Sequence, residues 1–252
     1  MTTGARPIGH QIIRLPEAVS TNTLVLESPE YLENHGLVVI AEHQTGGRGR
    51  VGRDWASLPG RQLQFSLVLH PPLPREQTPL LSLVAGLAVG NCLTRELALR
   101  PLLKWPNDVF LGARKVCGIL LEMKMQGGAP RVVVGIGLNC NGAPEDFPPD
   151  LQESLTTLAH ETGRAVNMQA LFAALLAGQQ EAYDRLLAGQ QTALLEEWSA
   201  MAALEGRALI YPTPEGPRPG KALGITEEGH LLIETAAGAT HVHHSGELEW
   251  TE

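Results

Sequence analysis

Glycines and arginines alternate in one segment of the chain, Gln44-Thr45-Gly46-Gly47-Arg48-Gly49-Arg50-Val51-Gly52-Arg53-Asp54-Trp55. Glycine allows backbone amides to approach an anion closely, and the planar guanidinium group of arginine matches the oxygens of a phosphate or carboxylate. A flexible glycine-arginine loop of the RNA-binding kind has a similar composition. This segment is a single cluster flanked by apolar sequence in an acidic chain, which favours a local site for a small anion.

The composition predicts a globular protein without general affinity for polyanions. The 252 residues are 43% hydrophobic, enough for one large and one small domain, and the formal net charge is -8. Binders of nucleic acid or anionic membranes usually spread basic residues over a whole face. The three cysteines, Cys92, Cys117 and Cys140, suggest neither disulfides nor a metal site and fit a reducing cytoplasm. Residues 1–7 lack a signal-peptide run, and residues 80–93 are too broken by polar residues and glycines to span a bilayer.

Apolar periodicity predicts strands and helices along most of the chain. Residues 62–69 alternate apolar and polar side chains, the pattern of a half-buried strand. Residues 37–41 and 131–136 are apolar runs typical of fully buried strands. Helical spacing predicts helices over about residues 78–98 and 168–187.

A hairpin is predicted between residues 109 and 125, where two apolar stretches flank the turn Gly112-Ala113-Arg114. This hairpin places Lys115 at the start of its second strand. Residues 140–150 contain glycines and prolines without periodicity, which predicts a mobile surface loop.

The last part of the chain changes character after a predicted helix that ends near Ala203. Short strands over residues 208–211, 221–225, 231–235 and 240–243, separated by glycine and proline turns, predict a small barrel-like domain. We interpret the histidines in the last of these strands as surface residues, because carboxylates or cysteines are missing at metal-like spacing. These histidines are His241, His243 and His244.

The glycine-arginine segment resembles the G-R-G-R-x-G-R-x-W loop of the biotin–protein ligase family. Three further motifs occur in the family's order, at Ser20-Thr21-Asn22, Lys104-Trp105-Pro106-Asn107-Asp108 and Gly135-Ile136-Gly137-Leu138-Asn139. The resemblance runs from about Ile12 to the end and includes Ser245-Gly246-Glu247, similar to the family's C-terminal Gly-Glu turn. It implies an α/β fold, with a mixed-sheet, class II synthetase-like catalytic domain over residues 1–204 and an SH3-like β-barrel over residues 205–252.

The resemblance also implies an activity. Members of the family use ATP and Mg²⁺ to convert biotin to biotinyl-5′-adenylate. They then transfer biotin to a lysine on the biotin carboxyl carrier domain of acetyl-CoA carboxylase or another biotin-dependent carboxylase. A cytoplasmic enzyme is implied, without a nucleic-acid or membrane partner, and a homodimer is left open. The helix-turn-helix domain of some members is expected to be absent, because only about ten residues precede the first predicted strand.

Matching positions in the motifs imply the roles of individual residues. The candidates for biotin binding are Ser20, Thr21, Asn22, Gln44, Gly47, Arg48, Gly49, Arg50, Lys115, Gly118, Gly135 and Gly137. The candidates for ATP or adenylate binding are Arg48, Arg50, Arg53, Trp55, Lys104, Asn107, Lys115 and Asn139, and those for the metal are Asp108 and Asn139. Lys115 and Arg48 are the candidate catalytic residues, since a cation between the biotin carboxylate and the α-phosphate offsets their repulsion.

Simpler interpretations exist for these motifs. Ser20-Thr21-Asn22 suits a helix N-cap, which is compatible with ligand binding. Lys115 alone would be a solvated hairpin lysine, and the Lys104–Asp108 segment a strand running into a turn. The joint match outweighs these interpretations. Residues 141–157 align poorly, so no adenine contact is assigned. Two other functions stay open: a lipoate–protein ligase-like enzyme of the same fold, and a biotin-sensing module without turnover.

Overall fold

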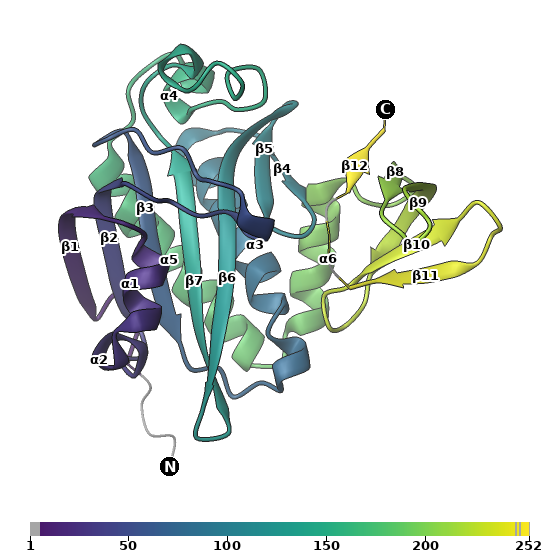
Figure 1. The fold of residues 1–252 in the computed structure, drawn as a ribbon, viewed down its shortest axis with the longest axis horizontal. Helices are drawn as coiled ribbons and strands as arrows, with labels where there is room; N and C mark the ends of the chain where they lie inside the picture. Colours follow the sequence, from purple (N-terminus) through teal and green to yellow (C-terminus); the bar gives the residue numbers. More distant parts are fainter. Residues whose placement is uncertain (1–5, 245, 247, 252) are drawn as a thin grey trace.

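A computed structural model describes residues 6–244, 246 and 248–251, and these residues form two β-sheets (Figure 1). The larger sheet has seven strands in the order β1-β2-β3-β7-β6-β5-β4, and the smaller has five in the order β11-β10-β9-β8-β12. Within the larger sheet β1 and β2 are parallel, whereas the other neighbours are antiparallel. The predicted mixed-sheet α/β fold with a small C-terminal β-structure is therefore confirmed.

The strands of the larger sheet carry the predicted pattern. They are β1 (Gln11–Ala18), β2 (Leu37–Gln44), β3 (Gln62–Leu69), β4 (Pro101–Lys104), β5 (Asp108–Leu111), β6 (Arg114–Gln126) and β7 (Ala129–Asn139). The helices are α1 (Thr21–Glu27), α2 (Pro29–Leu32), α3 (Leu80–Leu97), α4 (Leu158–Thr162), α5 (Met168–Leu187) and α6 (Gln191–Ala202). The predicted hairpin is β5–β6, and Lys115 is the second residue of β6.

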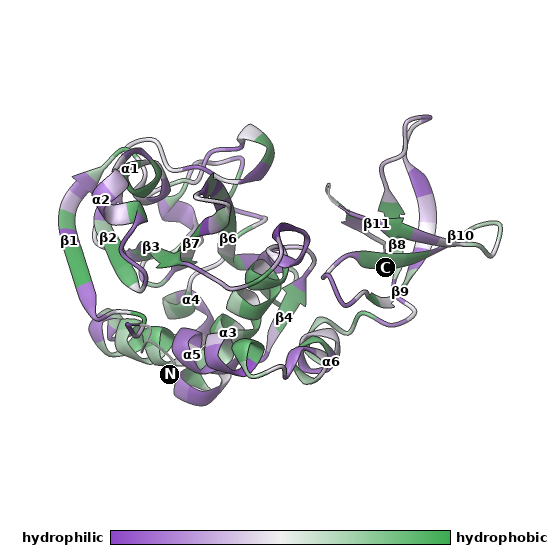
Figure 2. Ribbon diagram, turned by 90° about the horizontal axis from the view of Figure 1, so that it is seen from below, coloured by the Kyte–Doolittle hydropathy of each residue, from purple (hydrophilic) through white to green (hydrophobic). Residues whose placement is uncertain are grey.

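Helices cover the two faces of the large sheet unequally. In Figures 1 and 2 the long helices α3, α5 and α6 lie on one face, whereas the short α1 and α2 lie on the other. Helix α3 is apolar and long enough to cross a membrane by length and composition, but two thirds of that stretch is buried inside the protein. Its apolar character is explained by packing against the sheet and α5.

Strand β3 corrects one sequence prediction. Alternation predicted a half-buried strand, but all eight residues of β3 are buried. One face carries the apolar Leu63, Phe65 and Leu67 of the main core, and the other carries Gln62, Gln64 and Ser66. Buried polar groups of this kind are tolerated only when they are hydrogen-bonded. The polar face of β3 therefore belongs to a built polar layer rather than to solvent.

The loop after β7 is also different from its prediction. Residues 144–146 form a short 3-10 turn, and Cys140 and Phe147 are buried. Its far end lies beside β6, because the Lys115 amide donates to the Ser154 carbonyl and the Thr156 amide donates to the Lys115 carbonyl, both at 2.9 Å. The loop is thus partly buried and fixes the backbone of Lys115.

Trp105 makes one of the contacts that dock the C-terminal sheet onto the larger domain. Its strands are β8 (Ala208–Tyr211), β9 (Arg218–Ile225), β10 (Leu231–Thr235), β11 (Thr240–His243) and β12 (Glu249–Trp250). Trp105, which is 2% exposed, donates from Nε1 to the Gly229 carbonyl at 3.0 Å, and its ring lies 5.5 Å from that of His243. The proposed boundary at residues 204 and 205 falls between α6 and β8.

His243 is buried, so its interpretation as a surface residue is wrong. Burial, and then the neighbouring His241 and His244, hold the pKa of His243 below its usual value, so its ring is neutral at pH 7. Among the described residues no group of three or more His, Cys, Asp or Glu is placed to hold a metal ion. Ser245 and Glu247 of the resembling Gly-Glu turn lie outside the described residues.

We expect Trp105→Ala to destabilise the protein by about 3–5 kcal/mol, because the substitution empties a buried aromatic position between the two sheets. Trp105→Phe keeps most of the packing and loses the hydrogen bond to Gly229, so it should cost only about 1 kcal/mol. Urea unfolding followed by circular dichroism measures both losses. Equal losses in the two variants would contradict a packing role for the ring.

Candidate active site

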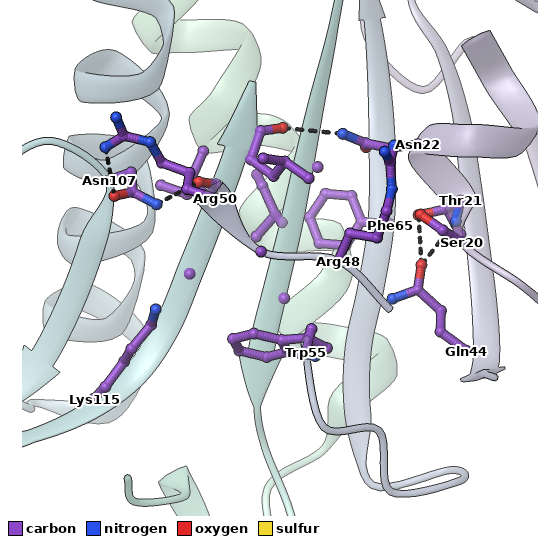
Figure 3. A pocket seen from close by; sticks show the side chains of 17 residues that line it. Ser20, Thr21, Asn22, Gln44, Arg48, Arg50, Trp55, Phe65, Asn107 and Lys115 are labelled. Carbon is purple, nitrogen blue, oxygen red and sulfur yellow. Dashed lines mark hydrogen bonds between the residues drawn. The ribbon is translucent and has the colours of Figure 1, made fainter. Parts of the chain in front are cut away.

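A pocket of about 490 Å³ opens on the face of the large sheet that the long helices leave uncovered (Figure 3). Its lining residues are Ser20, Thr21, Asn22, Gln44, Arg48, Gly49, Arg50, Trp55, Phe65, Asn107, Lys115, Gly118, Ile119, Leu120, Gly135, Ile136 and Gly137. All residues predicted for biotin except Gly47 are therefore brought together, and apolar residues from β3, β6 and β7 add to them.

One end of the pocket is built on the start of α1. Ser20 is the N-cap, and its hydroxyl accepts from the Thr23 amide at 3.4 Å, which confirms the helix-cap interpretation. The Thr21 amide and hydroxyl both donate to Oε1 of Gln44, at 2.7 and 3.1 Å. Nε2 of Gln44 in turn donates to Gln64 at 3.1 Å. The Gln44 side chain is thus held with a known orientation at the pocket wall.

Ser66 was not predicted from the sequence as part of the site. Its hydroxyl bonds to Thr21 and Asn22, the two residues that follow the N-cap. Its Oγ lies 2.7 Å from Oγ1 of Thr21 and 2.6 Å from Oδ1 of Asn22. Nδ2 of Asn22 donates to the Leu120 carbonyl at 3.1 Å and to Oε2 of Glu122 at 3.0 Å. Both amide hydrogens of Asn22 are therefore used, and its oxygen is the group that can still accept from a ligand.

Glycines make room for other side chains at the floor of the pocket. A Cβ added at Gly135 would collide with the carboxamide of Asn22, and one at Gly137 would lie 2.6 Å from the Trp55 ring. A Cβ added at Gly118 would lie 3.1 Å from the same ring. Gly47 lies behind the wall, where a Cβ would approach the Trp55 carbonyl to 2.7 Å. These glycines serve the close approach of Trp55 and Asn22 to the sheet.

The glycine-arginine loop crosses the pocket as a tight turn. Its two sides pair through the Gly49 amide, which donates to the Arg53 carbonyl at 2.7 Å, while Val51 and Gly52 adopt left-handed conformations. Arg48 points toward Asn22 and Arg50 toward Asn107 on the opposite side (Figure 3). Nη2 of Arg48 donates to both carboxylate oxygens of Glu122, at 2.9 and 2.7 Å. The loop is therefore fastened across the pocket.

A second pocket, of about 630 Å³, adjoins the first through residues that line both, among them Arg50, Asn107 and Lys115. It adds three residues predicted for ATP or the metal, namely Arg53, Lys104 and Asp108. Leu248 from the C-terminal region also lines it. Lys115 thus lies at the common wall of two pockets: the first adds uncharged polar groups such as Asn22 and Gln44, and the second adds Arg53, Lys104 and Asp108.

Lys115 and Asp108 form an ion pair at this wall, with Nζ 2.7 Å from Oδ1. The contact is close in distance but lacks hydrogen-bond geometry, and Oδ1 is buried without a hydrogen-bond partner among the described atoms. The Asp108 carboxylate is a hard oxygen donor, and a bound Mg²⁺ would share it with Lys115. Magnesium in nucleotide sites needs only one or two carboxylates in addition to phosphates and water. Asp108 therefore fits a magnesium ligand.

Asn139, which the motif predicts for the nucleotide and metal sites, lines neither pocket. It is 2% exposed, and its Oδ1 accepts from Gln62 at 2.8 Å while its Nδ2 donates to the Thr156 carbonyl at 3.1 Å. Its amide is used in closing the end of β7 onto β3 and the following loop.

The cysteines take no part in the pocket chemistry. All three are buried as thiols. Burial raises the pKa of Cys92 to about 11 and that of Cys140 to about 12, and it raises the pKa of Cys117 further. A thiol with a raised pKa is a poor nucleophile at neutral pH. Group transfer at this site therefore depends on its cations and on the reacting groups of its substrates.

Comparisons with known proteins agree with this geometry. The biotin/lipoate A/B protein ligase family matches residues 16–139. The bifunctional ligase/repressor BirA of Bacillus subtilis is 32% identical over 98% of this chain and 74% of its own length. A biotin–acetyl-CoA-carboxylase ligase of Mycobacterium tuberculosis is 33% identical over 97% of this chain and 91% of its own.

A solved structure of similar fold is the biotin protein ligase of Aquifex aeolicus in complex with biotin and ATP. It is 29% identical, has a TM-score of 0.82, and the match covers 96% of this chain and 99% of that one. The shared sequence, the shared fold and the loop fastened over two adjoining pockets lead to one conclusion. This chain belongs to the biotin protein ligases of the biotin/lipoate A/B protein ligase family.

Proposed function

We propose that this protein joins biotin to the AMP part of ATP and then transfers the biotinyl group to a lysine of a biotin carboxyl carrier protein. The observation that carries the proposal is the common wall at Lys115, where a pocket with uncharged polar groups at its far end meets a pocket lined by further charged residues. An enzyme that joins an acid to a nucleotide needs this division. Relatives named as biotin ligases support the same reaction.

The first pocket suits the two parts of biotin. A ureido ring presents N–H donors and a carbonyl acceptor. Oδ1 of Asn22 can accept from such an N–H group, while the second amide hydrogen of Gln44 can serve the carbonyl. Leu120 lies on the same face of β6 as Gly118, lines this pocket and fits the aliphatic chain of biotin.

The charged pocket suits the triphosphate. We assign Arg53 and Lys104 to its phosphates and Asp108 to Mg²⁺, which when bound neutralises phosphate charge. In the first step a biotin carboxylate oxygen attacks the α-phosphorus, the bond to the bridging oxygen breaks, and pyrophosphate leaves. Lys115 stands where two anions must meet, and Arg48 closes the biotin side. Their charges offset the repulsion and stabilise the charge that develops in the transition state.

The second step leaves the intermediate exposed to water unless the loop stays closed. The acceptor lysine, as a neutral amine, attacks the carbonyl carbon of the mixed anhydride, AMP leaves, and the amide nitrogen loses a proton to solvent. Trp55 packs on Gly137 beneath the loop, and Arg50 donates to Asn107 at 3.3 Å. Both contacts hold the loop over the position of the adenylate and exclude competing water.

The two rival functions fit the pocket less well. Lipoate carries an apolar dithiolane ring, which would leave the polar groups around Asn22 and Gln44 without partners. A sensing module needs no Lys115–Asp108 pair at the wall between pockets. The carrier protein as acceptor, a cytoplasmic location consistent with buried free thiols, and the absence of a DNA partner are parts of the proposal. Whether the protein is a homodimer is left open.

Mass spectrometry of a carrier domain incubated with the protein, ATP, Mg²⁺ and biotin tests the proposal. We expect the mass of one biotinyl group to be added to the carrier domain, and none when lipoate replaces biotin. Labelling with lipoate alone would instead support the lipoate ligase. Biotin binding without any adenylate or labelled carrier would support the sensing module.

Lys115→Ala should slow adenylate formation at least about a hundredfold, since removing a cation between two anions costs about 3 kcal/mol of transition-state stabilisation. Single-turnover formation of biotinyl-adenylate measures the change. The matched control is Lys124→Ala, because Lys124 lies on the same strand, outside both pockets, and donates to the Leu26 carbonyl. A near-normal rate for Lys115→Ala would remove this residue from the mechanism.

Arg50→Gly should impair retention of the adenylate more than its synthesis. The substitution removes one contact to Asn107, worth about 1.5–3 kcal/mol if charge-assisted, and makes the loop more flexible. Released adenylate would then biotinylate exposed lysines of a bystander protein. Bystander labelling and the adenylate synthesis rate should be measured together. Loss of synthesis without added bystander labelling would place Arg50 with the catalytic cations.

A further inference from the structure

Glu122 connects two parts of the pocket that the sequence motifs describe separately. It lies on β6, and its side chain is 24% exposed. Its Oε2 accepts from Nδ2 of Asn22 at 3.0 Å, and both carboxylate oxygens accept from Nη2 of Arg48, at 2.9 and 2.7 Å. One carboxylate is therefore shared between the start of α1 and the loop that crosses the pocket.

A carboxylate at this place needs a reason, because it stands beside a pocket proposed to receive an anion. An uncompensated negative charge there would repel the biotin carboxylate. The bond with Arg48 compensates it and uses one of the three guanidinium nitrogens. Because the guanidinium group is planar, fixing Nη2 also restricts the directions in which Nε and Nη1 of Arg48 can donate. Glu122 thus determines where the positive charge of Arg48 stands.

The second bond determines which way Asn22 faces. A carboxamide can turn over and exchange its oxygen and nitrogen, and the partners decide the orientation. Glu122 and the Leu120 carbonyl accept from Nδ2, so Oδ1 lies on the side of Ser66. This orientation presents an acceptor at the polar end of the pocket. Without the Glu122 carboxylate, one of the two contacts that fix the orientation is lost.

We propose that Glu122 is a positioning residue that couples the polar end of the biotin pocket to closure of the glycine-arginine loop. This inference rests on the proposed function. By holding Asn22 it supports the affinity for biotin, and by holding Arg48 it keeps the loop closed over the adenylate. Lys115 lies on the other side of the pocket from Asn22 (Figure 3), and its ion pair is with Asp108.

The test separates affinity and retention from the chemical step. Glu122→Gln keeps the shape and removes the charge. We expect the biotin KM to rise about tenfold or more, as losing a charged hydrogen bond usually does, and the saturating rate of pyrophosphate release to fall by a smaller factor, because Arg48 keeps its charge and loses only its anchor. Dissociation of added synthetic biotinyl-adenylate, followed by dilution and chase, should accelerate by up to about fivefold.

Two further variants exclude a general structural effect. Glu33→Gln breaks an ion pair with Arg131 on the same sheet, outside both pockets, and should leave both readouts unchanged. In an Arg48→Ala background, Glu122→Gln should not accelerate adenylate dissociation any further, because its effect on retention passes through Arg48. The melting temperature of each variant is measured alongside.

Three results would overturn the inference. The first is a Glu122→Gln variant with wild-type KM and adenylate dissociation in an active enzyme, and this leaves the proposed function intact. The second is a fall in the saturating rate alone, which would make Glu122 part of the chemistry. The third is full additivity of the two substitutions on adenylate dissociation. If the wild-type protein forms no adenylate at all, the proposed function fails and this inference fails with it.

Discussion

The close approach of the Trp55 ring to the bare backbone of Gly137 is the constraint on which the site depends. Any side chain at Gly137 would meet the indole at 2.6 Å, and the ring also lies over Gly118. Because the two glycines let the ring approach the sheet this closely, the loop that precedes Trp55 can line the pocket. The positions of Arg48 and Arg50 follow from this contact between Trp55 and the sheet, since both arginines belong to the turn that Trp55 closes.

A layer of polar groups lies over the sheet beside Trp55. Thr21, Asn22, Gln44, Gln64 and Ser66 bond to one another across β2, β3 and α1. Burying each group unpaired would cost about 1–3 kcal/mol, so the layer is tolerable only because its members are bonded. The same bonding fixes each carbonyl and amide before a ligand arrives. Preorganisation of this kind lowers the entropy lost on binding.

Apolar periodicity predicted helices and strands well, because the spacing of apolar residues follows the side of an element that is buried. The helix over residues 168–187 and the strand over residues 62–69 have the predicted bounds. The exposure of β3 was predicted wrongly, because alternation shows which residues are polar and does not show what covers them. The hydrogen bonds of Asn139 were also not predictable, since its partners Gln62 and Thr156 come from other segments.

The contacts missed from the sequence are long-range. Ser66 reaches Asn22 over 44 positions, and Glu122 reaches Arg48 over 74. Only the strand register determines that these residues meet, and an isolated Ser or Glu in a strand carries no sign of it. The family motifs located Lys115 and the loop because those residues occur in contiguous strings. The residues that orient them are scattered, so the structure was needed to identify them.

Charge pairing gives the last link between fold and reaction. Lys115 and Arg48, the two cations assigned to the chemistry, each stand 2.7 Å from a carboxylate, that of Asp108 and of Glu122 respectively. Their side chains are 32% and 44% exposed, so solvent weakens both pairs, and exposed pairs of this kind contribute at most about 1 kcal/mol. The carboxylates therefore hold the cations in position without binding them too tightly to turn toward an arriving phosphate or carboxylate. An acidic protein can in this way keep a cationic site directed at two anions.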